Sequence, residues 1–431
     1  MCEGKNDRDR IENAEIPTGI LRSVKSIDAF HRSHTPSLFP TAVAEKNTAA
    51  DHAAIPRKGS FRQDESDRHD MEKIKVGIIG CGGIANGKHM PSVRQLPDVE
   101  MVAFCDLIPE KAEAAKRTFG TPDAKVYTDY RDLLKDPSIT AVHVCTPNRS
   151  HSFITVDALH AGKHVICEKP MAINSAEAKK MLDAAKESGK ILTVGYQTRY
   201  KAEAAYMKRL CEDGELGEIY YAKALALRRR AVPTWGVFLN EYEQGGGPLI
   251  DIGTHALDLT LWLMDNYRPK MVVGSVFKKL GKQRETANAW GDWDPEKYTV
   301  EDSAFGFIVM ENGATISLES SWALNILDTQ EASTLLCGTK AGLDMRDGIR
   351  LNGVKYGRQY IERPDMNAGG AAFYEGTSGS APEVVEQQVF YNAVRNGTDI
   401  VVKPEQAYTV TRILEAIYES AKTGKPVYLS E

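Results

Sequence analysis

Two short segments of this sequence combine residue types suited to proton and hydride transfer. Residues 168–170 read Glu-Lys-Pro, and residues 245–255 read Gly-Gly-Gly-Pro-Leu-Ile-Asp-Ile-Gly-Thr-His. Asp251 and His255 are four residues apart, a spacing that places both on one face of a helix. Oxidation of a secondary alcohol needs a base for the hydroxyl proton, a cation for the charge on oxygen and a carboxylate that orients them. We therefore expect His255, Lys169 and Asp251 to be catalytic.

The same residues also allow purely structural roles. Asp251 and His255 could form a helical side-chain pair that does no chemistry, and Lys169 could pair with the adjacent Glu168. No metal is expected, because no third ligand follows Asp251 and His255 at short spacing.

A glycine-rich segment predicts a nucleotide site. Residues 80–85 match the pattern G-x-G-x-x-A directly after a predicted strand, which is typical of a loop that binds the pyrophosphate of a dinucleotide. The residues expected to contact the cofactor there are Gly80, Gly82, Gly83, Ile84 and Ala85.

Asp106 lies 21 residues beyond Ala85, about where an acid accepts the ribose hydroxyls of NAD. NADP is less expected, because this acid would repel a 2′-phosphate and residues 107–109, Leu-Ile-Pro, supply no arginine. The alternative is that Asp106 only caps the next helix.

Further candidates follow two later strands, whose carboxyl ends should face the cofactor. These are Thr146, Pro147, Asn148, His151, Glu168 and Lys169. A role for His151 as an ordinary residue at a helix start is the competing interpretation.

The elements that must position these residues alternate between strand and helix from Met71 to Tyr196. The apolar runs predict strands at 75–79, 100–105, 141–145, 164–167 and 191–195, with helices at 108–119, 150–161 and 175–188. This alternation predicts an α/β fold, a doubly wound parallel sheet over 71–196.

After Tyr196 the pattern changes to successive strands joined by turns. We expect an α+β domain over 197–431, with a large, mostly antiparallel open sheet and two closing helices. The predicted strands are 219–228, 271–277, 303–310, 314–323, 332–337 and 349–351, and the predicted helices are 382–396 and 404–423.

Composition excludes several classes of protein. The 431 residues include 54 Lys and Arg against 59 Asp and Glu, so the net charge of −5 argues against a nucleic-acid or membrane partner. No apolar run of about 18 residues predicts a membrane span. Seven scattered cysteines without zinc spacing favour a reducing compartment, and we expect a cytoplasmic protein. Residues 1–70 lack Trp, Tyr and apolar periodicity and are expected to be a disordered leader.

The glycine motif, Glu-Lys-Pro at 168–170 and the segment at 245–255 together resemble the glucose-fructose oxidoreductase / inositol dehydrogenase / MocA family over essentially residues 73–429. The resemblance implies a Rossmann domain, a second domain whose open sheet mediates homodimers or homotetramers, and a sugar or cyclitol pocket between the two. It also implies that Lys169, Asp251 and His255 surround the reacting carbon.

Several polar and aromatic residues could set the substrate, since aromatic faces pack on sugars and arginines bind hydroxyls. Tyr196, Arg199 and Trp235 are candidates, with Trp290 and Trp293 in addition. The Arg-Arg-Arg run at 228–230 could contribute or could simply be a solvated strand end.

The leading functional hypothesis is an NAD-dependent dehydrogenase that takes hydride from a secondary hydroxyl of a sugar, glycoside or cyclitol. Two alternatives are a redox-neutral NAD-dependent glycoside hydrolase of the same family and a non-catalytic NAD-binding sensor. Retention of Lys169, Asp251 and His255 together argues against the sensor, because a binder needs no proton acceptor.

Overall fold

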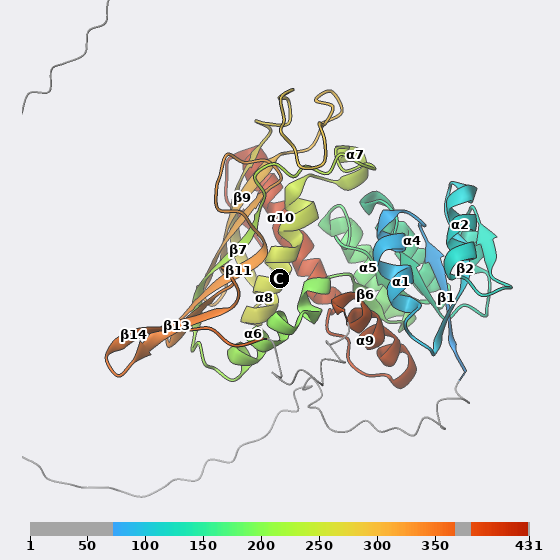
Figure 1. Ribbon diagram of the computed structural model, residues 1–431, viewed down its shortest axis with the longest axis horizontal. Coiled ribbons are helices and arrows are strands. Elements are labelled where there is room, and N and C mark those ends of the chain that lie inside the picture. Colours follow the sequence, from blue (N-terminus) through green and yellow to red (C-terminus); the bar gives the residue numbers. More distant parts are fainter. Residues whose placement is uncertain (1–71, 367–380, 430–431) are drawn as a thin grey trace, which may run out of the picture. The chain divides into compact units, whose positions relative to one another are not determined.

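The computed structural model describes residues 72–366 and 381–429 (Figure 1). The leader expected at 1–70 lies outside the described residues.

The first sheet has six parallel strands in the order β3-β2-β1-β4-β5-β6. They are β1 (Ile74–Ile79), β2 (Val99–Cys105), β3 (Lys125–Tyr127), β4 (Ala141–Val144), β5 (His164–Cys167) and β6 (Leu192–Val194). The strand order reverses between β1 and β4, and ligands of such sheets bind beyond the carboxyl ends of the strands at this point. The predicted doubly wound sheet is confirmed.

Short helices connect these strands. They are η1 (Ala85–His89), α1 (Met90–Val93), α2 (Pro109–Phe119), α3 (Tyr130–Leu134), α4 (Asn148–His160) and α5 (Ser175–Ser188). At the start of α5, Asn174 Oδ1 accepts a hydrogen bond from the Glu177 amide at 2.9 Å, and the helix ends at Gly189 with φ +63°. The chain then forms η2 (Gln197–Tyr200) and α6 (Ala202–Glu212).

The second sheet has nine strands in the order β14-β13-β12-β11-β7-β10-β9-β8-β15. Its strands are β7 (Ile219–Leu227), β8 (Pro269–Phe277), β9 (Ser303–Met310), β10 (Thr315–Ser321), β11 (Gln330–Gly338), β12 (Ala341–Asp344), β13 (Arg350–Lys355), β14 (Arg358–Glu362) and β15 (Val427–Tyr428). The central pair, β7 and β10, is parallel and the other pairs are antiparallel, so the expectation of a mostly antiparallel sheet is confirmed.

Helices cover one face of this sheet. The remaining helices are α7 (Glu241–Gln244), η3 (Leu249–Gly253), α8 (Thr254–Met264), α9 (Pro382–Asn396) and α10 (Pro404–Thr423). Figure 1 shows α8 and α10 along the sheet, where α10 also contacts α5 of the first domain. The strands alternate accordingly, because Val272 and Ile308 are fully buried whereas the next pair, Val273 and Phe307, is 38% and 48% exposed.

The sequence missed the elements that lack a clear periodic pattern. The strand β14 has no buried residue, so its sequence shows no alternation of apolar and polar side chains. The helical segment η1 begins at Ala85, the last residue of the glycine motif, where a dinucleotide loop is followed by a helix.

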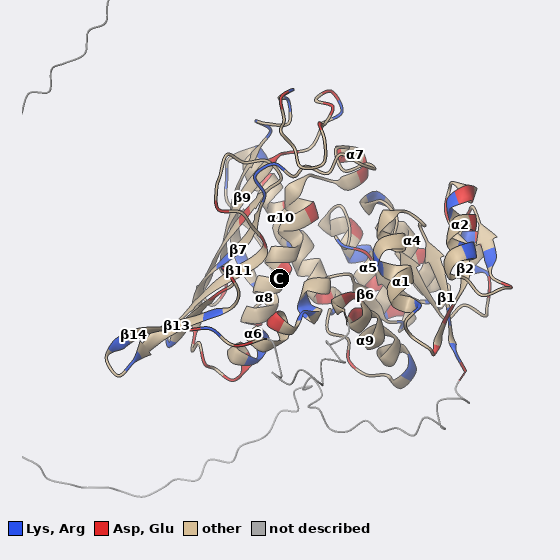
Figure 2. Ribbon diagram, in the orientation of Figure 1, with Lys and Arg blue, Asp and Glu red and all other residues tan. Residues whose placement is uncertain are grey.

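Acidic and basic residues are mixed along the fold. In the view of Figure 2, Lys and Arg are interspersed with Asp and Glu over both domains. Across residues 72–366 and 381–429, no helix combines the length and the apolar character needed to cross a bilayer.

Candidate active site

The glycine loop at the end of β1 leaves open space where a side chain would otherwise lie. Gly80 has φ +89°, and a Cβ atom there would lie 2.7 Å from the carbonyl oxygen of Cys145, so only glycine fits. A Cβ atom at Gly82 or Gly83 would meet no atom within 4 Å. Ala85 is fully buried and begins η1. The backbone is therefore accessible at the amino end of a helical segment.

Asp106 lies at the end of β2 and its two carboxylate oxygens are fixed by backbone amides. Oδ2 accepts a hydrogen bond from the Cys81 amide at 2.9 Å, and Oδ1 accepts one from the Ile108 amide at 2.9 Å. The second contact lies ahead of α2, whose N-cap is Ile108 and has no side-chain hydrogen bond, so Asp106 does not cap this helix. The first joins Asp106 to the glycine loop, and each oxygen retains a lone pair for another donor.

The segment after β4 forms a hydrogen bond to the second domain. Asn148 Nδ2 donates to the carbonyl oxygen of Gln244 at 3.0 Å, and Thr146 Oγ1 accepts from Ser150 at 2.8 Å. His151 is fully buried, with one ring nitrogen 2.8 Å from the carbonyl oxygen of Pro170 and the other 2.9 Å from that of Thr146. His151 thus tethers two loops, and the structure does not bring its ring to an open surface.

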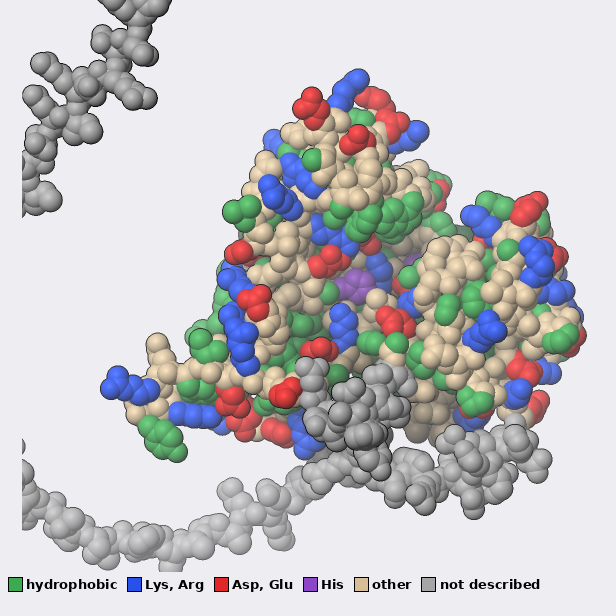
Figure 3. Space-filling view, viewed as in Figure 1, with side chains coloured by type: hydrophobic (Ala, Val, Ile, Leu, Met, Phe, Trp, Pro, Cys, Tyr) green, Lys and Arg blue, Asp and Glu red, His purple; other side chains and the backbone are tan. Residues whose placement is uncertain are grey.

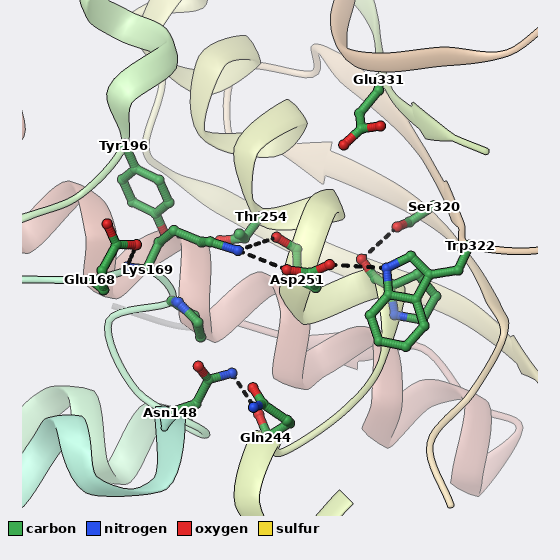
Figure 4. Close-up of polar contacts among 12 residues, drawn as sticks. Asn148, Glu168, Lys169, Tyr196, Gln244, Asp251, Thr254, Ser320, Trp322 and Glu331 are labelled. Carbon is green, nitrogen blue, oxygen red and sulfur yellow. Dashed lines mark hydrogen bonds and ion pairs between the residues drawn. The ribbon is translucent and has the colours of Figure 1, made fainter. Parts of the chain in front are cut away.

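Lys169 and Asp251 face one another from the two domains (Figure 4). Lys169 Nζ lies 2.8 Å from Asp251 Oδ1 and 2.9 Å from the Asp251 carbonyl oxygen. Trp322 Nε1 donates to the other carboxylate oxygen, Oδ2, at 3.0 Å. Burial opposes ionisation of Asp251, but the Lys169 ammonium outweighs it and lowers the pKa of this carboxyl. The pairing of Lys169 with Glu168 that the sequence allowed is not observed.

The position of Asp251 depends on a second buried carboxylate, Glu301. Its oxygens accept hydrogen bonds from the amides of Gly247 at 2.8 Å and Leu249 at 3.1 Å, at the start of η3. A Cβ atom at Gly247 would lie 2.4 Å from the Glu301 carbonyl oxygen, which explains the glycine. Sequence reasoning missed Glu301 and Trp322, since both lie far along the chain, Glu301 just before β9 and Trp322 just after β10.

His255 follows Asp251 by one helical turn and stays neutral. Burial, followed by the nearby Lys169 ammonium, lowers the pKa of its imidazole to about 3. Its Nδ1 is buried and has no hydrogen-bond partner among the described residues. The Tyr196 ring packs edge-on against it, with ring centroids 6.2 Å apart. A neutral imidazole carries a lone pair on one ring nitrogen, where it can accept a proton.

Glu168 faces away from this group, into a buried network. Its Oε1 lies 2.8 Å from both Lys88 Nζ and His89 Nε2, and its Oε2 accepts from the Lys169 amide at 3.1 Å. Burial raises the pKa of Glu168, but Lys88 and His89 more than compensate and hold it well below its usual range. Lys88 Nζ also forms an ion pair with Glu386 Oε2, at 2.9 Å.

The network continues through two more rings. His89 Nδ1 contacts His143 Nδ1 at 2.8 Å, and His143 Nε2 contacts the Tyr391 hydroxyl. Because the Glu168 carboxylate only accepts, His89 Nε2 carries a hydrogen and donates to it. All of these groups are buried, so sequence periodicity gave no signal of their chemistry.

Two candidate substrate residues prove to be structural. Arg199 is buried, and its five N–H groups are used by Asp258, the Val401 carbonyl, Gln406 and Tyr267. It has no donor left for a sugar, and this expectation was wrong. Tyr196 is also fully buried, and its hydroxyl contacts Thr254 Oγ1 at 2.9 Å. Tyr196 therefore packs against the His255 ring and is not part of an open surface.

The three tryptophan candidates differ in their exposure to solvent. Trp235 and Trp290 are 52% and 44% exposed, with ring centroids 5.0 Å apart. Trp293 is buried and donates to the Gly281 carbonyl oxygen at 2.9 Å, so it belongs to the core. In the arginine run, Arg228 pairs with Glu331 and Arg230 donates to Asn325 Oδ1 at 2.7 Å.

The surface is hollowed beside these groups. Figure 3 shows a histidine side chain in the hollow, with a basic side chain next to it and a hydrophobic area along its border. Lys169 and Asp251 retain 18% and 13% of their side-chain exposure, so the pair is accessible to a small molecule. Among the described residues, no group of three His, Cys, Asp or Glu side chains could hold a metal ion.

Comparison with known proteins agrees with this architecture. Residues 74–196 match the model of an oxidoreductase family with an NAD-binding Rossmann fold, and residues 208–429 match the model of its C-terminal alpha/beta domain. D-glucoside 3-dehydrogenase of Escherichia coli (strain K12) is 36% identical over 83% of this chain and 97% of its own length.

More distant relatives are similar over the same extent. The scyllo-inositol 2-dehydrogenase (NADP(+)) of Bacillus subtilis is 28% identical over 84% of this chain and 98% of its own length. A structure of levoglucosan dehydrogenase in complex with NADH and levoglucosan has a TM-score of 0.70 at 23% identity, covering 84% of this chain and all of that one. That likeness shows the fold. With both family models matched, the chain belongs to the glucose-fructose oxidoreductase / inositol dehydrogenase / MocA family of oxidoreductases.

Proposed function

We propose that this protein is an NAD-dependent dehydrogenase that oxidises a secondary hydroxyl of a D-glucoside. Its family membership and its named relatives make it a dehydrogenase acting on CH–OH groups of sugars or cyclitols. The observation that carries the proposal is the Lys169–Asp251 ion pair beside a neutral His255, reached from the surface. Within the substrate class, the 36% identity to a D-glucoside 3-dehydrogenase favours a glucoside and its 3-hydroxyl.

The glycine loop and Asp106 fit a dinucleotide. The open backbone at Gly82 and Gly83 leaves room for a pyrophosphate at the positive end of η1. Asp106 offers two oriented carboxylate oxygens to ribose hydroxyls, and a 2′-phosphate there would meet negative charge, which supports NAD over NADP. When bound, NAD would supply the hydride acceptor.

Ile84, Thr146, Pro147 and Asn148 are proposed to line the cofactor site. Ile84 is 42% exposed at the front of η1, and the other three follow β4 at the switch point of the sheet. Glu168 and His151 would act indirectly, because their polar atoms are bonded within the protein.

His255 is proposed to take the hydroxyl proton. A lowered pKa keeps its imidazole neutral over the ordinary pH range, so a lone pair is available to the substrate. The hydroxyl proton moves to the ring nitrogen as the carbon–hydrogen bond breaks, which leaves a carbonyl and an imidazolium that then loses its proton to solvent.

Lys169 is proposed to hold the reacting oxygen. An ammonium has three N–H donors, and Asp251 receives two of them, through Oδ1 and its carbonyl oxygen. The third can bind the substrate hydroxyl and stabilise the negative charge that develops on it. Trp322 and Lys169 together fix the Asp251 carboxylate, so the ammonium is aimed before substrate arrives.

The test is to incubate the purified protein with NAD and a panel of monosaccharides, glucosides and cyclitols. NADH would be followed by absorbance and the products by NMR. Formation of NADH and a 3-keto glucoside in equal amounts would support the proposal. Glucoside cleavage without net NADH would establish the redox-neutral hydrolase instead, and NAD binding with neither product across the panel would favour the sensor.

The domain limits, compartment and assembly are also proposed. We assign residues 71–196 to cofactor binding and 197–431 to substrate binding and assembly. A cytoplasmic location is supported by the free thiols of the six described cysteines. A homodimer or homotetramer is supported by the open face of the second sheet, where Val273, Phe277 and Phe307 are more than a third exposed. Analytical ultracentrifugation would test the assembly.

A further inference from the structure

A continuous series of aromatic rings leads away from the Asp251 carboxylate. It begins at Trp322, which donates to Asp251 Oδ2, and passes to Phe238 with ring centroids 6.3 Å apart. Phe238 contacts Trp235 at 5.9 Å, and Trp235 contacts Trp290 at 5.0 Å. Each pair is edge-to-face, one of the two arrangements that aromatic rings prefer.

Exposure increases along this series. Trp322 is fully buried, whereas Trp235 and Trp290 are 52% and 44% exposed. Two adjacent tryptophans that keep this much surface in water are typical of a binding surface, because burying them elsewhere would be favourable. The series therefore runs from the proposed reacting centre to an open aromatic surface made by Trp235 and Trp290.

The loops that carry this surface are held in place. Thr234 Oγ1 donates to the Trp290 carbonyl oxygen at 2.8 Å. Asn288 Oδ1 accepts from the Val232 amide at 2.8 Å, and its Nδ2 donates to the Val232 carbonyl oxygen at 3.0 Å. A fixed surface loses little conformational entropy when a ligand binds.

Polar side chains border the two tryptophans. The Arg228 guanidinium carbon lies 5.2 Å from the centre of the Trp290 ring while the same side chain pairs with Glu331. Aromatic faces combined with planar hydrogen-bonding groups recognise sugar rings, whose C–H faces are apolar and whose edges carry hydroxyls.

We propose that Trp235 and Trp290 bind a second pyranose ring, joined by a glycosidic bond to the ring that is oxidised beside Asp251. The inference rests on the proposed function, since it assumes that a sugar ring occupies the site at Lys169 and Asp251. It narrows the substrate class from glucosides in general to disaccharides of glucose. The second ring adds binding energy at the surface without touching the reacting carbon.

The test compares glucose disaccharides of several linkages with methyl glucoside, by the rate of NADH formation. Trp235→Ala and Trp290→Ala should each lower kcat/KM for the preferred disaccharide about tenfold, with the double variant lower still. For methyl glucoside, kcat/KM should stay within about twofold of the wild type, which also shows that the variants fold. Tyr356→Ala, at a fully exposed residue of the β13–β14 turn, is the matched control and should change neither substrate.

Equal losses on both substrates, or no loss on either, would overturn the subsite. If the wild type oxidises no glucoside, the proposed function fails, and calorimetric binding of the disaccharides still decides the subsite. In that case, wild-type binding of a disaccharide that is lost in the double variant supports it, and absence of wild-type binding refutes it. A phenyl glucoside tests whether the surface made by Trp235 and Trp290 binds an aromatic aglycone instead of a second sugar ring. If the enzyme prefers phenyl glucoside to every disaccharide, the surface does not bind a sugar.

Discussion

Lys88 Nζ lies 2.8 Å from Glu168 Oε1, and both side chains are buried. Lys88 belongs to η1, directly after the glycine loop, and Glu168 immediately precedes Lys169. The other Glu168 oxygen accepts from the Lys169 amide. One ion pair therefore connects the helical segment of the proposed cofactor site to the backbone of the proposed catalytic lysine.

Replacement of Lys88 tests how much this connection contributes. Lys88→Met leaves Glu168 and Glu386 buried together without a cation, so we expect a loss of about 3–5 kcal/mol in the free energy of unfolding. Chemical denaturation measures it. Glu386→Gln in the same background should recover part of the loss, because one of the two carboxylates is then neutral.

A surface pair of the same length provides the control. Lys73 Nζ lies 2.8 Å from Glu100 Oε1, but its side chain is 50% exposed. Lys73→Met should therefore cost no more than about 1 kcal/mol. If Lys88→Met and Lys73→Met lose the same free energy of unfolding, the buried network contributes no more to stability than a surface ion pair.

The catalytic assignment predicts separate effects on turnover and on cofactor binding. Lys169→Met and His255→Asn should each lower kcat by about 10²–10⁴-fold, since each removes a group at the reacting oxygen. NAD affinity, measured by calorimetry, should change by less than about threefold. Loss of NAD binding in either variant would contradict the placement of these residues at the substrate.

Most of the fold could be predicted because its long elements have clear periodicity. The helices at 175–188, 382–396 and 404–423 were predicted to the residue, and each ends at a glycine with positive φ. The parallel pairing of β7 with β10 could not be predicted, since it depends on long-range contacts that leave no local pattern.

Local sequence identifies candidate site residues where the proposed chemistry depends on spacing along the chain. The glycine motif, Asp106, Asp251 and His255 are candidates of this kind, and their roles stay predictions. Arg199 was misassigned because an arginine after a buried strand looks the same whether it meets solvent or a buried Asp258. Trp322 was missed because only the folded sheet brings it to Asp251.

The cofactor assignment predicts a change of preference at one residue. Asp106→Ser should weaken NAD about ten- to a hundredfold, because charge-assisted hydrogen bonds to ribose are lost, and should lessen discrimination against NADP. Steady-state KM values for both cofactors measure this. Asp129→Ser, at the start of α3, removes a comparable contact to the Arg131 amide and should leave cofactor preference unchanged. If the ratio of the KM values for NAD and NADP is the same in Asp106→Ser as in the wild type, Asp106 does not bind the ribose.

Trp322 is expected to orient Asp251 through one N–H group. Trp322→Phe keeps an aromatic ring and removes the 3.0 Å contact to Oδ2, so kcat should fall about tenfold while NAD affinity stays the same. Trp293→Phe is the matched control, because it removes a 2.9 Å contact from another buried tryptophan to a backbone carbonyl. That variant should lower stability without lowering kcat, and equal kcat values in the two variants would reject an orienting role.

The lowered pKa of His255 predicts how activity responds to pH. With an imidazole pKa near 3 instead of 6.5, His255 is neutral from pH 5 upward. The acid limb of kcat/KM should therefore lie well below pH 6.5. An acid limb centred between pH 6 and 7 would mean that His255 is not the neutral base of the free enzyme.

The same shift makes a prediction about stability that does not depend on turnover. Between pH 6.5 and 3 the unfolded His255 binds a proton that the folded form does not, so the free energy of unfolding decreases as the pH falls through this window. His255→Asn lacks this proton, and the stability of the wild type relative to the variant should drop by about 3 kcal/mol between pH 7.5 and 4.5. Urea denaturation at both pH values measures the difference. A relative stability of His255→Asn that is constant with pH would exclude a depressed pKa at this residue.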